Sequence, residues 1–75
     1  MSEYQETRRF KCMSHTGNPC IVIEQSRVAN EAISSPRTDY MTEDGEVANR
    51  LDKKHFLILM NGEVVRIQRA LRKRH

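Results

Sequence analysis

The chain has 75 residues and a formal charge of +3 at pH 7, which predicts one domain and excludes Rossmann domains and NTPases on size alone. Leu, Ile, Val and Phe total 16 residues, or 21% of the chain. This is just above the roughly 20% below which charged chains tend to be disordered, so we expect a small core. No apolar run reaches the ~18 residues of a membrane-spanning helix, and we expect no membrane partner.

The positive charge is concentrated at the C-terminus. Residues 1–65 hold 8 Lys/Arg and 10 Asp/Glu, whereas the last ten residues hold five basic residues and no acidic one. We therefore divide the chain into a small β domain (residues 1–67) and a basic tail (residues 68–75), and expect the fold to survive deletion of the tail. Such a tail is an electrostatic handle or a solubility element. Its candidate binding residues, with the strand end before it, are Arg66, Arg69, Arg72, Lys73 and Arg74.

The first half of the chain begins with a hairpin pattern. Over residues 4–13, Phe10 and Cys12 alternate with their neighbours in the manner of a half-buried strand. Residues 14–19 are rich in turn formers, and residues 20–23 are mostly β-branched, which favours a second strand.

Residues 26–34 change character. Ser26 is a typical helix N-cap, and apolar side chains follow at helical spacing before Pro36 ends the pattern. We expect a short helix that docks on the sheet, because a helix of two turns is marginal alone. The alternative is an irregular excursion between two hairpins.

Two glycine-containing turns organise the second half. Asp44-Gly45 and Asn61-Gly62 are favoured two-residue hairpin loops, which need positive φ at both positions. The strands that they join are expected over residues 38–42, 47–51, 56–60 and 64–67, with a polar turn over residues 52–54 and the last strand ending near Ile67 or Gln68. Beyond it we expect a single helical turn or disorder.

These elements predict a mainly β protein of five or six strands. The expected architecture is a small twisted antiparallel meander or an SH3-like, partly closed barrel. The predicted core is Phe10, Cys12, Ile21, Ile23, Leu51, Phe56, Ile58, Val65 and Ile67. Leu57 and Leu59 fall on the second face of the sheet, which favours a homodimer through an exposed strand edge.

Cys12 and Cys20 are the two cysteines, and His15 lies between them. The Cys-x7-Cys spacing differs from the close pairs of structural zinc sites, so we expect no metal and no cofactor, even with His55 or His75 as further ligands. No third group orients His15 as the base of a cysteine nucleophile. Without a secretory signal, both cysteines indicate the reducing cytoplasm and the role of small buried side chains. A disulfide is feasible only if their strands pair directly.

Residues 40–66 carry a recurring set of features: Tyr40, Asp44-Gly45, Val47, Asn49-Arg50, Asp52, Phe56-x-Ile58, Asn61-Gly62-Glu63 and Arg66. Together with Phe10, Cys12, Thr16-Gly17 and residues 22–24, they resemble a group of small uncharacterised bacterial proteins. The resemblance covers about two thirds of the chain. It implies a bacterial or mobile-element source and no activity. The basic terminus and Cys20 depart from the group.

Asn49 and Arg50 are the first candidates for a binding site within the fold, because Asn is depleted in strand interiors. In the structural interpretation, Asn49 bonds to a neighbouring turn. Arg50 then pairs with Asp52 or Glu46. In the functional interpretation, Arg50 and Arg66 form an anion-binding spot.

No paired acid and base and no cofactor motif marks a catalytic site, so we expect no enzyme. The leading hypothesis is a non-catalytic interaction module that binds another macromolecule, with a protein partner favoured. The alternative is a nucleic-acid-binding accessory protein that uses the basic C-terminal tail. Two Phe, two Tyr and no Trp are few for a base-stacking surface.

Overall fold

A computed structural model describes residues 4–27 and 37–72 of the chain. Six antiparallel strands follow one another in the sheet, and pairing of the last with the first closes a barrel. This confirms the predicted mainly β fold. The strands are β1 (Tyr4–Ser14), β2 (Pro19–Arg27), β3 (Arg37–Thr42), β4 (Val47–Arg50), β5 (His55–Ile58) and β6 (Glu63–Arg72).

The predicted helix falls mostly on residues that the structure does not describe. Ser26, its expected N-cap, lies within β2 and pairs with Thr38 of β3. The following residues 28–34 lie outside the described part of the chain. Among the described residues there is no helix long and apolar enough to cross a membrane.

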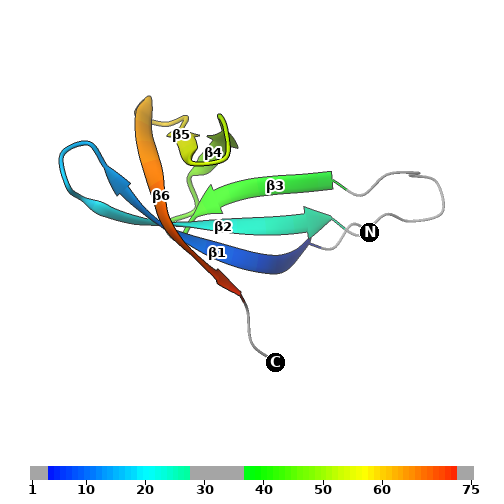
Figure 1. The fold of residues 1–75 in the computed structure, drawn as a ribbon. Coiled ribbons are helices and arrows are strands. Elements are labelled where there is room, and N and C mark those ends of the chain that lie inside the picture. The colour runs from blue at the N-terminus through cyan, green and yellow to red at the C-terminus, as the bar shows by residue number, and fades with distance from the viewer. Residues whose placement is uncertain (1–3, 28–36, 73–75) are drawn as a thin grey trace.

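β1, β2 and β3 extend beyond the closed part of the barrel. β1 pairs with β2 from its first residue, Tyr4, but β6 reaches along β1 only as far as Arg8. In Figure 1 these three strands run side by side, while β4, β5 and β6 curl over one part of them. The barrel therefore continues into a three-stranded ribbon.

β6 extends further than the sequence predicted. The strand was expected to end near Ile67 or Gln68, but it continues to Arg72, and its last four residues pair with residues 8–11 of β1. The reason is tertiary: the edge of β1 would otherwise have unpaired backbone groups, and β6 satisfies them by closing the barrel. The boundary between a domain ending at residue 67 and a free tail is therefore wrong.

Both predicted two-residue turns are longer. Gly45 N donates to Thr42 O, and Thr42 N donates to Glu46 O, at 2.9 and 2.8 Å, which makes a three-residue loop. Gly62 N donates to Ile58 O at 2.9 Å, which makes a four-residue loop before Glu63. Each loop needs positive φ only at its glycine, 87° and 69° respectively. Two-residue loops would have required it at the preceding Asp and Asn as well.

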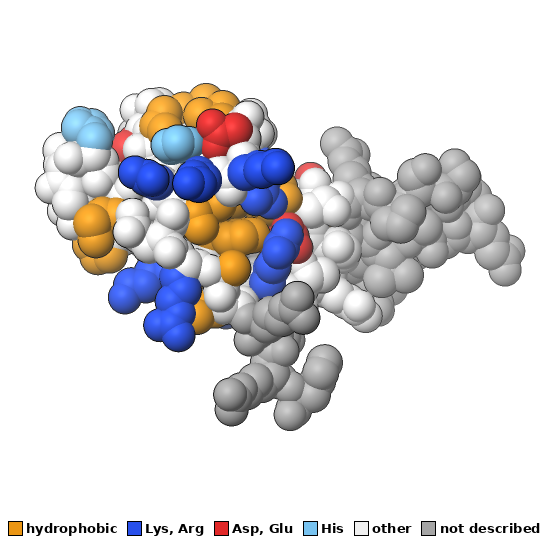
Figure 2. All heavy atoms as spheres, in the orientation of Figure 1, with side chains coloured by type: hydrophobic (Ala, Val, Ile, Leu, Met, Phe, Trp, Pro, Cys, Tyr) orange, Lys and Arg blue, Asp and Glu red, His pale blue; other side chains and the backbone are white. Residues whose placement is uncertain are grey.

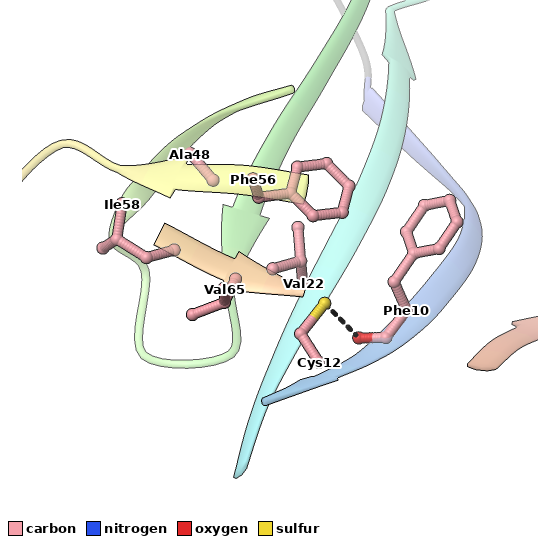
Figure 3. Packing of buried hydrophobic residues seen from close by; sticks show 7 residues of the cluster. All are labelled: Phe10, Cys12, Val22, Ala48, Phe56, Ile58 and Val65. Atoms are coloured by element: carbon pink, nitrogen blue, oxygen red, sulfur yellow. Dashed lines mark hydrogen bonds between the residues drawn. The ribbon is translucent and has the colours of Figure 1, made fainter. Parts of the chain in front are cut away.

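Seven buried hydrophobic side chains form the core, and Figure 3 shows them converging between the strands. They are Phe10, Cys12, Val22, Ala48, Phe56, Ile58 and Val65. Five of these were predicted. Phe10, Phe56 and the partly buried Tyr40 form a triangle of tilted rings with centroids 5.0–6.5 Å apart.

The sequence assigned two strands to the wrong face. Val22 is fully buried, while Ile21 and Ile23 are only partly buried on the outer face of β2. In β4, Ala48 is buried, whereas Leu51, just beyond the strand, is 52% exposed. Ile67 packs against the core but is only partly buried. The larger apolar side chains were expected inside, but here they lie on the outer face.

Candidate binding surfaces

The two ends of the barrel carry opposite charge. The turn end, defined as residues 14–22, 41–48 and 57–64, contains four acidic residues and no Lys or Arg. The open end, defined as the other described residues, contains eleven Lys/Arg and four Asp/Glu. Positive charge is therefore concentrated away from the hairpin turns, although Arg9 of the open end reaches Glu43 of the turn end.

Arg50 lies in the mouth of the barrel at the open end. Its guanidinium carbon is 5.2 Å from the centre of the Phe10 ring and 5.7 Å from that of Phe56, within cation–π range. Nε donates to the main-chain oxygen of Asp52 at 3.1 Å, and Nη2 to that of Lys53 at 3.2 Å. Arg50 therefore fixes the 52–54 loop against the aromatic cluster. It bonds to the carbonyl of Asp52 rather than to its carboxylate, which corrects the predicted pair.

Glu24 is the buried charge of the open end, and it faces inward from β2. Its Oε1 accepts hydrogen bonds from Thr7 Oγ1 at 2.6 Å and Arg8 Nε at 3.1 Å. Its Oε2 accepts from Arg8 Nη2 at 3.3 Å and Tyr40 Oη at 3.1 Å. A bulge in β1 between Glu6 and Arg8 accompanies this arrangement.

The hydrogen bonds keep the Glu24 carboxyl ionised. Burial acts to raise its pKa, but the donors outweigh burial and hold the pKa below its usual value. These donors are Thr7, Arg8 and Tyr40. With both oxygens already accepting, the carboxylate is a structural anchor rather than a base open to a substrate.

The β3–β4 seam opens into a groove. β3 and β4 pair only at Tyr40↔Ala48 and Met41↔Val47. The next hydrogen-bonded pair in this register, which would join Thr38 to Arg50, is not made. Alternation along an antiparallel ladder directs the N–H and C=O of those two residues toward the gap. Both walls of the groove are thus unpaired strand edges.

The groove has a volume of about 770 Å³ and an apolar lining. Tyr4, Val47 and Leu51 line it and are 48%, 55% and 52% exposed. Met41 pairs with both Val47 and Ile23, so an apolar row crosses the outer face of three strands beside the groove. Of this row, Ile23 was predicted to lie in the core.

The opposite seam, β1–β6, carries a group of basic side chains that we call the basic seam: Lys11, Lys53, Lys54, Arg66 and Arg69. Lys11 and Arg69 are direct cross-strand partners. Ile67 N donates to Lys54 O at 2.6 Å, which holds the 52–54 loop beside β6. Figure 2 shows Lys and Arg side chains around a small apolar area on the face that β6 crosses in Figure 1.

All five side chains of the basic seam are exposed, and none forms an ion pair with another described residue. Arg8 and Arg9, by contrast, are paired with Glu24, Glu6 and Glu43.

The structure separates the binding residues that the sequence grouped together. Arg50 aligns with the buried Phe56 on the inner face, whereas Arg66 is exposed on the outer face, so they do not form one anion-binding spot. Asn49 is exposed and lines the groove. No side-chain hydrogen bond joins it to a turn within the described residues. Arg72 ends β6 opposite Arg8.

Lys73 and Arg74 lie outside the described residues.

The sequence analysis missed the groove because the groove depends on where two strands stop pairing, for which the sequence carries no local signal.

The two cysteines face each other directly. Cys12 pairs in register with Cys20, and both are free thiols. Burial, and then the neighbouring Cys20, raises the pKa of Cys12 to about 12, and burial also raises that of Cys20. Among the described residues, no three His, Cys, Asp or Glu side chains gather in a metal-binding group.

Comparison with protein-family models, curated proteins and solved structures finds no match to the chain. The resemblance to small bacterial proteins therefore stays a prediction, and the function has to be argued from the surfaces themselves.

Proposed function

We propose that the chain is a non-catalytic interaction module that binds an extended segment of a partner protein in the β3–β4 groove. The carrying observation is the missing Thr38–Arg50 pair, which leaves backbone donors and acceptors on both walls. A peptide strand inserted there extends the ladder from either edge. This mode of recognition takes its affinity from main-chain hydrogen bonds and its specificity from alternate side chains.

The lining of the groove supports this mode. Its volume of about 770 Å³ is within the range of roughly 300–1,000 Å³ for ligand sites. Val47 and Leu51 provide apolar contacts along the β4 wall. The side-chain hydrogen bonds of Arg50 to the 52–54 loop hold that wall in place, so little ordering is required on binding.

Thr38→Pro is the sharpest test. It removes the one backbone N–H that the β3 wall presents, while the ladder with β2 uses the neighbouring odd-numbered residues and stays intact. Thr38→Ala is the matched control, since it keeps the N–H. Peptides selected from a display library against the wild-type chain should bind Thr38→Ala normally and Thr38→Pro at least tenfold more weakly, as measured by calorimetry.

Two results would contradict the proposal. One is a selection that enriches no peptide, and the other is equal binding of the enriched peptides to both variants. Sedimentation adds a third arm: a wild-type dimer that Thr38→Pro converts to a monomer would identify the occupant as a second copy of the chain, not a partner protein.

A further inference from the structure

We infer that the basic seam binds the phosphate backbone of nucleic acid, independently of base sequence. This surface lies on the side of the barrel opposite the groove, because β1 and β6 are the most distant neighbours of β3 and β4 around the sheet. The inference is separate from the proposed function and involves no residue of the groove walls.

The cross-strand pair at the centre of the seam is unfavourable without a ligand. Lys11 and Arg69 are directly opposite, and like charges in this position are destabilising. No acidic side chain neutralises either of them among the described residues. A bound anion would relieve this repulsion.

The rest of the seam extends this positive surface. Arg66 lies two registered pairs further along the seam, opposite Met13. The hydrogen bond from Ile67 N to Lys54 O brings the 52–54 loop alongside. None of the four acidic residues of the turn end forms an ion pair with the basic seam, and Glu43 pairs with Arg9 instead. The chain therefore presents its positive end to a polyanion, which accelerates association at low salt.

The exposed side chains favour contact with the phosphate backbone over recognition of the bases. Phe10 and Phe56 are 3% and 0% exposed, so neither is free to stack on a base, and the exposed Tyr4 lines the groove instead. With about four or five phosphates neutralised, binding to duplex DNA should show a log–log salt slope of about −4, a loss of roughly 250-fold between about 50 and 200 mM salt.

The test is a fluorescence anisotropy titration of a short labelled DNA duplex with the full chain. Lys11→Gln with Arg69→Gln should weaken binding at least tenfold at about 50 mM salt and shift the slope by about +2. Its melting temperature should be unchanged or higher, since the like-charge pair is removed. Thr38→Pro should bind DNA normally, which separates this inference from the proposed function.

A charge-restored variant distinguishes binding at the basic seam from binding that depends only on the net charge of the chain. Adding Glu46→Gln and Glu63→Gln to the double variant returns the formal charge to +3 with the basic seam still reduced. Binding should stay weak. Restored binding would overturn the inference, as would the absence of any DNA binding at about 20 mM salt, where screening is weak. Binding to anionic vesicles in place of DNA would reassign the surface to membranes.

Discussion

The β1–β6 and β3–β4 seams lie on opposite sides of this barrel and differ in how many residue pairs join their strands. β1 and β6 share seven registered residue pairs, whereas β3 and β4 share two. The long seam is covered by exposed cations, and the short one opens into an apolar groove with free backbone groups. Because the β1–β6 ladder closes the barrel around its core, the β3–β4 ladder can stay incomplete.

Deleting residues 68–75 breaks the closed seam and should have the largest effect. The deletion removes four of the seven β1–β6 pairs and uncovers the edge of β1 beside Phe10. Because small domains have only about 5–15 kcal/mol of stability, we expect the cooperative thermal transition to be lost.

Deletion of residues 73–75 is the control, since it removes none of these pairs. A wild-type melting curve for the longer deletion would show that the barrel does not depend on the second half of β6.

Glu24→Gln tests the network that links the ribbon to the barrel mouth. Replacing a carboxylate that accepts charged hydrogen bonds should lower the free energy of unfolding by about 1–3 kcal/mol at pH 7. Because the folded pKa is depressed, the carboxylate stabilises the fold above the unfolded value of about 4.3, and this contribution is lost as pH falls through the folded pKa.

Urea titrations of this variant and the wild type should therefore differ at pH 7 and converge in strong acid. Asp44→Asn, at an exposed turn position, should leave stability unchanged. A constant gap between the Glu24→Gln and wild-type curves across this pH range would rule out the ionised network.

Gly62→Val tests the loop that begins the long strand of the closed seam. A β-branched residue at φ of 69° is strained, and we expect a loss of about 1–2 kcal/mol in urea unfolding. Asn61→Ala should cost less, because Asn61 is not in the left-handed region. The Asn61→Ala substitution still removes the hydrogen bond that Glu63 N donates to Asn61 Oδ1 at 2.9 Å. Equal losses would indicate a two-residue turn after all.

Cysteine alkylation probes the closed seam in the wild-type chain, without any substitution. With its pKa raised to about 12, Cys12 should react with iodoacetamide at pH 8 at least about 100-fold more slowly than a free thiol, and at the normal rate once unfolded. Mass spectrometry of peptides from the alkylated protein reads both sites. Fast labelling of Cys12 in the native state would mean that the seam opens.

The sequence predicted the closed part of the molecule better than the open part. Strong alternation marked Phe10 and Cys12, and the apolar stretch around Phe56 marked a buried strand. In β2 and β4 the same rule failed, because the inner faces carry Glu24 and Arg50, whose polarity is satisfied by tertiary partners that no local pattern shows. The apolar side chains on their outer faces were then mistaken for core.

The candidate sites follow the same division. The positive charge of residues 66–72 was visible in the sequence, but it belongs to a strand and not to a tail. Its partners Lys11, Lys53 and Lys54 join it only through strand register and a loop contact. The predicted pairing of Arg50 with Arg66 failed because neighbouring register positions point to opposite faces. The groove itself depends on strand divergence, which no residue type specifies.

Amide hydrogen exchange followed by NMR tests the contrast between the seams most directly. In the closed seam, Arg9 and Met13 direct their N–H groups toward β6 and should exchange slowly, near the limit of global unfolding. In the open seam, Thr38 and Arg50 should exchange almost as fast as an unfolded chain, whereas Tyr40 and Ala48 next to them should be protected. Slow exchange at both Thr38 and Arg50 would show that β3 and β4 pair throughout, and the groove would not exist.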